Sequence, residues 1–424
     1  MEQRSELLPG VFLHSVTTSK FKTGCFSMNF LRPHGKKEAS LNALLPSVLL
    51  RGTEQHPDIA AISGALDELY GATLGSLVRK KGGVQMTGLY CDYIEDCYVP
   101  EGEAVFARAA EFAGEVLLCP KLENGVFCDL SVQGEKRNLI NAIEGQKNDK
   151  RSYLVQQLIR QMFRGEEFGV PRLGEIEDVE KITPEGLYAH YRNVLATSCV
   201  EIFYMGGKTH AEAAEVFRKV LKELPRSAPF TEYTVGDIKK KTSEVETHTL
   251  NMEVTQGKLA IGLRTGCGVE EEAYPALMLL NIVLGAGITS KLFVNVREKR
   301  SLCYYASSSL DKYRGIMLIS SGVEFDKLDI TCEAILQELD ACKRGDIADE
   351  ELKNAKRLAL NALETMMDAP GRLDDFYLGM AICPKMLGVE ALIEAIRELE
   401  IPQLVAAAKK IECDTVFYLR GLDA

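Results

Sequence analysis

The chain has 424 residues, of which 46% are hydrophobic and 26% are charged. These values are ordinary for a globular protein of about two to four domains. The formal net charge of −11 argues against nucleic acid and anionic membrane as main partners, because both require a cationic surface. No apolar run reaches the roughly 18 residues of a transmembrane helix, and Glu2 and Glu6 stand where a signal peptide would be basic, so we expect a cytoplasmic protein.

Strands and helices are expected in a definite order in the first half of the chain. An alternating strand over 27–33 precedes a helix with an apolar stripe over 38–53. The stretch 76–93 is typical of two strands around a glycine turn, and 101–118 of a long helix. A further helical segment, KRNLINAIEG, follows at 136–145.

The second half repeats this order. A strand is expected at 259–266, a helix at 272–287, a pair of strands at 304–325 and a helix at 326–345. The segment KRLALNALET at 356–365 then matches KRNLINAIEG at Lys, Arg, Asn, Ala and Glu. Such a repeat of about 200 residues indicates an internal duplication.

The duplication predicts an α+β fold with two homologous domains, each a mostly antiparallel sheet with helices packed on it, arranged as a clamshell. We expect an N-terminal domain at 1–225 and a C-terminal domain at 248–424. Between them, 226–247 is polar and carries Pro229, Gly236 and a lysine triplet, which is typical of a linker.

Twelve cysteines are scattered singly along the chain, without a CxxC pair. The closest two are Cys91 and Cys97. In a large chain without an export signal, this pattern predicts buried free thiols rather than disulfides or a cysteine zinc site.

The duplicated order resembles that of the M16 peptidase family, which includes the pitrilysin, insulysin and mitochondrial processing peptidase groups. The resemblance covers nearly the whole chain. In the first domain, 168–195 is similar to the family's Pro-x-x-Gly, Ile-Thr and tyrosine-bearing helix. The most specific match is LGAGITSKLFVNVREKRSLCYY at 284–305, which resembles the family's glycine-rich turn, Ser-x-Leu, Arg-Glu-Lys and downstream tyrosine.

The resemblance implies a degenerate metal site. Active members carry His-x-x-Glu-His on the first helix, with two zinc ligands one turn apart and a general base between them. Alignment on Gly52-Thr53 places Ala43 and Ser47 at the two histidine positions and Pro46 at the glutamate position, so we expect no zinc on this chain. Pro46 inside a helix would cost about 3 kcal/mol unless it lies near a helix start or kink.

Two further features bear on a metal. A later glutamate completes the family's ligand set, and Glu135 in EKRNL stands at that position, although one carboxylate cannot hold zinc alone. No two of the six histidines lie within five residues of each other, and we expect them at surface or capping positions. They are His14, His34, His56, His190, His210 and His248.

Some M16 peptidases are pairs of different chains, one with zinc and one without the metal motif. The second chain keeps an arginine and a tyrosine seven residues apart that help to position substrate in the partner's site. Arg297 and Tyr304 have this spacing here. Arginine offers a planar set of donors to a peptide carbonyl, and tyrosine can donate to an oxyanion. Tyr305, on the opposite strand face, is the competing candidate.

Two glycine-bearing stretches complete the comparison. Active members place Asn-Ala on an edge strand that pairs with substrate, and Leu74 and Gly75 stand at the equivalent place, so only backbone pairing is expected. Gly285 and Gly287 lack the rest of a phosphate-binding motif and are expected in a turn between helices.

These observations predict a non-catalytic subunit of a heterodimeric M16 zinc peptidase. Its partners would be a chain bearing His-x-x-Glu-His, with the zinc, and an extended peptide substrate. The alternative is a scaffolding or peptide-binding M16 homologue without a role in proteolysis. A free-standing zinc peptidase would need a metal site of another kind.

Overall fold

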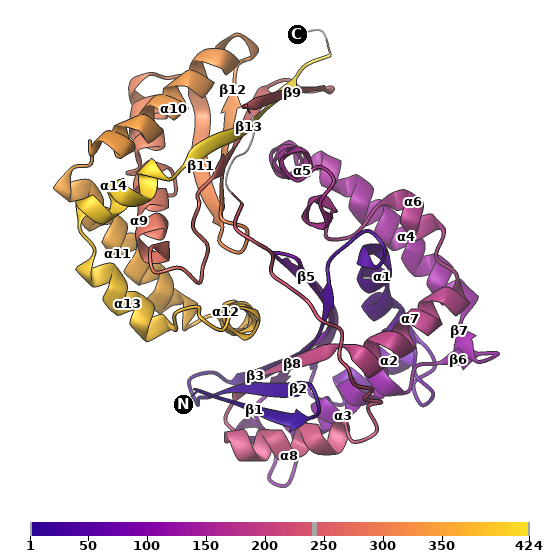
Figure 1. Cartoon of the computed structure of the whole chain (residues 1–424). Coiled ribbons are helices and arrows are strands. Elements are labelled where there is room, and N and C mark those ends of the chain that lie inside the picture. The colour runs from indigo at the N-terminus through magenta and orange to yellow at the C-terminus, as the bar shows by residue number, and fades with distance from the viewer. Residues whose placement is uncertain (1, 240–243, 423–424) are drawn as a thin grey trace. The chain divides into compact units, whose positions relative to one another are not determined.

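The computed structural model describes residues 2–239 and 244–422, and its residue contacts divide the chain into two compact units (Figure 1). Unit 1 comprises Met1–Glu144, Val170–Thr234 and Pro370–Ala381. Unit 2 comprises Gly145–Gly169, Val235–Ala369 and Ile382–Ala424. The expected domain boundaries stay predictions, and linker residues 240–243 lie outside the described residues.

Unit 1 contains a six-stranded sheet in the order β1-β2-β8-β3-β5-β4. All neighbours are antiparallel except β2 and β8, which are parallel. The strands are β1 (Glu2–Leu8), β2 (Val11–Thr17), β3 (Thr23–Pro33), β4 (Thr73–Lys81), β5 (Val84–Ile94) and β8 (Cys199–Gly206). A separate pair consists of β6 (Leu122–Glu123) and β7 (Val126–Phe127).

Helices of unit 1 cover one face of this sheet with an apolar core. Phe26 and Phe30 of β3 point into that core, and α1 and α3 pack on β5 above it. Thr183 and Thr209 begin α7 and α8 by accepting backbone N–H groups. The helices are α1 (Ala39–Leu49), α2 (Ile59–Asp67), α3 (Val105–Leu118), α4 (Asp129–Gly145), α6 (Ile176–Glu180), α7 (Pro184–Thr197) and α8 (His210–Val220).

Unit 2 contains a five-stranded sheet in the order β11-β12-β10-β13-β9. Read from β9, this order matches β2-β8-β3-β5-β4 of unit 1, and the parallel pair, β9 with β13, occupies the corresponding place. The strands are β9 (Glu246–Asn251), β10 (Gly257–Arg264), β11 (Cys303–Asp311), β12 (Ile316–Val323) and β13 (Glu412–Arg420). The predicted mostly antiparallel sheets are therefore confirmed, and the two units share one strand order, as an internal duplication predicts.

The helices of unit 2 lie on both sides of its sheet. In Figure 1, α9, α10 and α14 lie on one side and α5 on the other. The helices are α5 (Lys150–Met162), α9 (Tyr274–Leu284), the π-helix η4 (Leu292–Lys299), α10 (Leu328–Arg344), α11 (Asp349–Met366), α13 (Val389–Glu398) and α14 (Ile401–Lys409).

Each unit takes one helix from the opposite half of the sequence. In unit 1 this is α12 (Pro370–Ile382), which packs on the sheet face opposite the main core. Asp374 of α12 accepts from Ser27 Oγ of β3 at 2.9 Å and pairs with Arg79 of β4. The ring of Tyr377 stacks on His14 of β2 with the centroids 4.1 Å apart. Polar groups on this face of the sheet thus find their partners on α12.

In unit 2 the corresponding helix is α5, which covers the second face of the sheet with a small apolar cluster. Arg151 at its start donates to Ser320 Oγ of β12 at 3.1 Å. Arg264 of β10 donates to Met162 O at the end of α5, at 2.8 Å, and lies over the Phe163 ring. Both sheets are therefore buried on both faces, which explains why β3 and β12 are buried along nearly their whole lengths.

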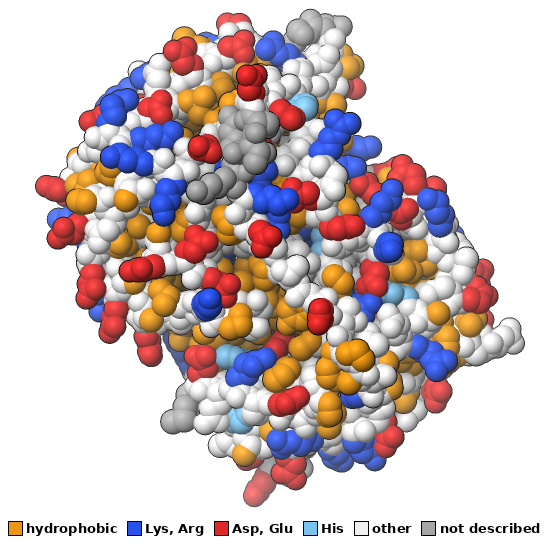
Figure 2. Space-filling view, in the orientation of Figure 1, with side chains coloured by type: hydrophobic (Ala, Val, Ile, Leu, Met, Phe, Trp, Pro, Cys, Tyr) orange, Lys and Arg blue, Asp and Glu red, His pale blue; other side chains and the backbone are white. Residues whose placement is uncertain are grey.

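The polar segment after α8 has no helix or strand over 226–239, and parts of it are anchored. Arg226 donates to Leu195 O and Ser198 O in unit 1. Lys239 pairs with Glu166 at 2.9 Å in unit 2. Over the face that Figure 2 shows, acidic and basic side chains are interspersed.

The cysteines are free thiols, and their burial is mixed. Five are buried, but Cys97 and Cys119 are exposed, so the expectation of buried thiols was wrong for these two. Cys97 lies in a short helical turn and Cys119 directly follows α3, where the chain leaves the core.

Candidate functional site

The helix at the place of the family's metal-binding helix is α1, and its side chains are packed as core. Ala43 is buried against the sheet and Pro46 is buried within the helix, while Ser47 is half-buried. Alanine and proline offer no zinc ligand, and serine is not among the side chains that zinc ordinarily takes. The three positions therefore do not fit the family's metal.

Pro46 lies in the middle of α1, and the surrounding structure compensates for it. A proline has no N–H group, so the carbonyl of Asn42, four residues earlier, loses its helical donor. The Thr87 hydroxyl of β5 donates to that carbonyl at 2.7 Å. A strand side chain thus satisfies the backbone group that proline leaves without its helix partner.

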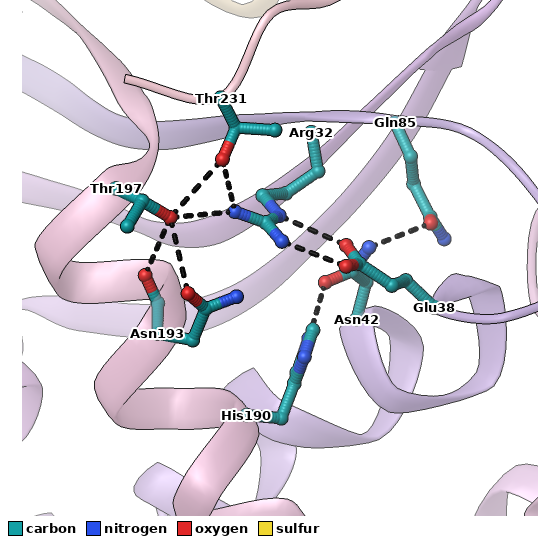
Figure 3. A network of polar contacts seen from close by, with 8 residues as sticks. All are labelled: Arg32, Glu38, Asn42, Gln85, His190, Asn193, Thr197 and Thr231. Atoms are coloured by element: carbon teal, nitrogen blue, oxygen red, sulfur yellow. Dashed lines mark hydrogen bonds and ion pairs between the residues drawn. The ribbon is translucent and has the colours of Figure 1, made fainter. Parts of the chain in front are cut away.

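A buried hydrogen-bond network lies beneath α1 (Figure 3). Asn42 donates from Nδ2 to Gln85 Oε1 at 3.0 Å, and its Oδ1 lies 2.8 Å from His190 Nε2. Gln85 in turn donates to Ala39 O and Arg172 O. Burial lowers the pKa of His190 to about 4, so the ring is neutral at pH 7 and donates to Asn42.

Arg32 forms a second part of the polar network in Figure 3. Its guanidinium makes two hydrogen bonds to the Glu38 carboxylate, at 2.9 and 2.7 Å. It also donates to the hydroxyls of Thr197 and Thr231, each at 2.9 Å. This network joins β3, the start of α1, the end of α7 and the segment after α8, and its charges are paired within the fold.

Glu135, at the family's later glutamate position, is paired with an arginine. It lies within α4, and its Oε1 is 2.7 Å from Arg51 Nε, just beyond the end of α1. Asn138 on the next turn donates to the same carboxylate. The guanidinium supplies positive charge to this carboxylate, so Glu135 is engaged in a structural ion pair.

Three of the six histidines are buried, contrary to the expectation of surface or capping positions. His14 stacks on Tyr377, and His34 Nε2 lies 2.8 Å from Val170 O. His190 belongs to the network under α1. A histidine ring has an apolar part and a polar nitrogen, and in the interior both find neighbours. The spacing of the histidines along the sequence does not reveal this role. Among the described residues, no group of three or more histidine, cysteine, aspartate and glutamate side chains could hold a metal ion.

The structure brings Arg297 and Tyr304 together at one cavity in unit 2. This cavity of about 360 Å³, which we call the Arg297 cavity, is lined by Arg297, Glu298, Ser301, Leu302, Cys303, Tyr304, Glu324 and Lys327. Arg297 lies over the Phe293 ring at 4.5 Å and approaches Glu298 at 3.5 Å. Tyr304 is 57% exposed and donates from its hydroxyl to Glu324 Oε1 at 3.3 Å. An arginine and a phenol thus face one solvent-accessible space.

Two irregularities of the backbone set the position of Tyr304. Cys303 pairs with Val323 and Tyr305 with Gly322, so Tyr304 is the extra residue of a β-bulge in β11. A bulge changes the direction of one side chain, and β11 is an edge strand of its sheet. Ser301, between η4 and β11, has a left-handed backbone with φ of 51°, which permits the tight turn.

Tyr305, the competing candidate, lies on the other face of β11. Its ring is half-buried beneath α5, where the guanidinium of Arg151 lies 4.5 Å from the ring centroid. It is not among the residues that line the Arg297 cavity. Tyr304 is therefore the tyrosine that shares a cavity with Arg297.

The other two expectations for strands and turns are confirmed. Leu74 and Gly75 lie on β4, at the edge of the sheet of unit 1. Gly285 and Gly287 lie in the turn between α9 and η4. Sequence reasoning missed Glu324, because an exposed glutamate in a polar stretch carries no signal of its own, and it missed Thr87, whose role depends on a proline far away in sequence.

No helix in the described part of the chain is long and apolar enough to cross a membrane.

Comparison with known proteins identifies relatives of this chain. A family model described as the peptidase M16 inactive domain matches residues 181–359. The "Probable inactive metalloprotease YmfF" of Bacillus subtilis (strain 168) is 30% identical over 414 residues, covering 98% of this chain and 96% of that protein. A crystal structure of a conserved protein from Enterococcus faecalis V583 shares 29% identity with a TM-score of 0.89, covering 100% of this chain and 99% of that one.

A more distant structure shares the fold. The peptidase M16 inactive domain from Pseudomonas fluorescens is 17% identical, with a TM-score of 0.79, covering 99% of this chain and 98% of that one. The similarity to the relative from Bacillus subtilis extends along almost the whole of both chains. The chain therefore belongs to the peptidase M16 family.

Proposed function

We propose that this chain is the non-catalytic subunit of a two-chain M16 zinc peptidase. Arg297 and Tyr304 would position a peptide substrate in the active site of a partner that bears His-x-x-Glu-His. The observation that carries the proposal is the shared cavity, in which both side chains face solvent. At the family's metal-site helix the chain has Ala43, Pro46 and Ser47, so the zinc is expected on the partner.

The chemistry of the pair suits substrate positioning. The Arg297 guanidinium has several N–H donors in one plane and can bind a peptide carbonyl through two of them. The Tyr304 hydroxyl is a neutral donor that can stabilise negative charge on the carbonyl oxygen as the bond is attacked. The partner's zinc would activate the attacking water. Neither side chain of this chain needs a metal for its part.

The proposal predicts a physical complex, which a tagged chain recovered from its native cells can test. The eluate should contain a chain with His-x-x-Glu-His, bound zinc and peptide-cleaving activity that the partner lacks on its own. Arg297→Ala and Tyr304→Phe should retain the complex and lose cleavage. Arg300→Ala and Tyr98→Phe are matched controls, because Arg300 lies three residues further and Tyr98 is similarly exposed at 51%.

The alternative functions give different results in the same experiment. A scaffolding homologue would be recovered with partners whose activity does not change in either variant. A peptide-binding homologue would be recovered alone, without zinc, and would bind extended peptides as an isolated chain. If the purified pair cleaves peptides no better than the partner alone, the proposed function is wrong.

A further inference from the structure

A second cavity lies beside the Arg297 cavity. It has a volume of about 710 Å³ and is lined by Thr255, Gln256, Tyr304, Glu324, Phe325 and Asp326, and we call it the Gln256 cavity. The two cavities share two lining residues, Tyr304 and Glu324. The hydrogen bond between these two side chains therefore lies where the cavities meet.

Residues at the ends of three strands line the two cavities. Arg297 lies near the end of η4, Tyr304 at the start of β11, Glu324 directly after β12 and Gln256 directly before β10. Backbone at strand ends has N–H and C=O groups that an extended peptide can pair with. A continuous space from Arg297 to Gln256 would accommodate more of an extended peptide than either cavity alone.

The contact between the cavities is weak and exchangeable. The Tyr304–Glu324 distance of 3.3 Å is longer than the roughly 2.7–2.8 Å of an ordinary O–H···O bond. Both side chains are exposed, and Glu324 is held from the other side by Lys327 at 2.8 Å. Lys327 also lowers the pKa of Glu324, so the group remains a carboxylate and an acceptor at neutral pH.

A phenol has one proton to donate, and this limits what Tyr304 can do. While the hydroxyl donates to Glu324, it cannot donate to a peptide oxygen. We propose that Glu324 is a positioning residue for Tyr304: its carboxylate holds the phenol between the two cavities, and a bound peptide replaces it as acceptor and joins them into one groove. This inference rests on the proposed function and extends its site to the Gln256 cavity.

The kinetic test uses the purified two-chain complex. Glu324→Ala removes the competing acceptor, so KM for peptide should fall about three- to tenfold with kcat unchanged. Glu324→Gln retains an acceptor oxygen and should stay close to the unaltered chain. Asp329→Ala is the control, because it removes an exposed carboxylate of α10 that lines neither cavity.

If Glu324 acts through the Tyr304 hydroxyl, the effect of Glu324→Ala on peptide binding must disappear when that hydroxyl is removed. Because Tyr304→Phe is expected to lose cleavage, binding is compared in that background through the Kd of a labelled peptide for the complex, and Glu324→Ala should leave that Kd unchanged. An effect of Glu324→Ala on peptide affinity that persists in that background, or an effect on KM that Asp329→Ala reproduces, overturns the inference and leaves the proposed function standing. If Tyr304→Phe itself leaves cleavage unchanged, the proposed function fails first.

A spectroscopic test of the Tyr304–Glu324 contact needs no partner. The chain carries 3-fluorotyrosine at position 304 alone, and the ¹⁹F NMR signal is compared between variants. Glu324→Ala should shift the signal, and Asp329→Ala should not. In the purified two-chain complex, a mixture of short unstructured peptides should move the signal toward the Glu324→Ala position. An identical signal with and without Glu324 would show that the carboxylate does not hold the phenol, which overturns the inference.

Discussion

The two copies of the repeated segment keep the same lysine contact in both units. Lys136 of α4 donates to Glu180 O and Ile182 O at 2.8 Å each, at the end of α6. Lys356 of α11 stands at the same place in the repeat and donates to Arg397 O near the end of α13, at 2.7 Å. Cations at a helix C-terminus satisfy carbonyls that lack helical donors. The contact common to both units is therefore one that holds helices in place.

The first helices of the two units differ where the family's chemistry would lie. In α1, the Asn42 carbonyl, which Pro46 leaves without its helical donor, accepts from Thr87, and the Asn42 side chain bonds to His190. In the aligned helix α9, Leu280 stands at the position of Pro46 and is fully buried. A polar network therefore fills this place in unit 1, and an apolar side chain fills it in unit 2.

The edge strands differ as well. β4 pairs with β5 residue for residue from Thr73 to Lys81, whereas β11 has the bulge at Tyr304. A regular strand presents backbone, while a bulge presents one side chain in a new direction. The comparison places the candidate site in unit 2 and leaves unit 1 with an edge strand whose backbone alone can pair.

The largest expected effect tests the helix that unit 1 takes from the other half of the sequence. Asp374→Ala removes the partner of Arg79 in a buried contact, and should lower the unfolding free energy by about 3–5 kcal/mol. Urea unfolding checks this. Asp340→Ala, which breaks an exposed pair with Lys343, should cost less than about 1 kcal/mol. Equal losses in both variants would contradict the assigned role of α12.

The neutral His190 predicts a pH dependence of stability specific to unit 1. Burial lowers its pKa from 6.5 to about 4 in the folded chain, so the unfolded chain binds more protons between these values. Stability should therefore fall as pH falls from 6.5 to 4, by up to about 3 kcal/mol from this group. His190→Gln should reduce the loss measured between pH 7 and pH 4, and an unchanged loss would contradict a neutral buried ring.

The paired lysines allow a direct comparison of the two units. Lys136→Met keeps the aliphatic stem and leaves two carbonyls without their donor in a buried place, with an expected cost of about 2–3 kcal/mol. Lys356→Met removes one contact at a half-buried place and should cost about 1 kcal/mol. Thermal unfolding measures both. A larger cost for Lys356→Met would show that the two contacts do not play the same role.

The smallest effect concerns Pro46. Thr87→Val leaves the Asn42 carbonyl without a donor and should cost about 1–2 kcal/mol. In a Pro46→Ala background, the new N–H can donate to that carbonyl, so the cost of Thr87→Val should be smaller. If the changes in unfolding free energy of the two substitutions are additive, Thr87 does not compensate for the proline.

Much of the fold follows from local patterns in the sequence. Each strand, helix and hairpin can be predicted from the periodicity within its own segment. The second half of the chain repeats the order of the first half, which supports the same prediction. The placement of α5 and α12 could not be predicted in this way. An apolar helix face shows that a helix packs, but not which of two homologous sheets it covers.

Part of the candidate site could likewise be predicted from the sequence, and part could not. The spacing of Arg297 and Tyr304 is visible in the sequence through the family resemblance, and the structure places both at one cavity. The bulge at Tyr304 and the acceptor Glu324 depend on the register of β11 against β12, which no local pattern determines. The partner of Glu135, Arg51, likewise comes from a different helix end.

The most direct test of the central claim is the rate of peptide cleavage by the purified pair of chains, with Arg297→Ala compared with Arg300→Ala. We expect kcat/KM to fall about 100-fold for Arg297→Ala, with the complex and its zinc intact, and to stay unchanged for Arg300→Ala. Equal rates for Arg297→Ala and the unaltered chain would contradict a substrate-positioning role for the Arg297 cavity.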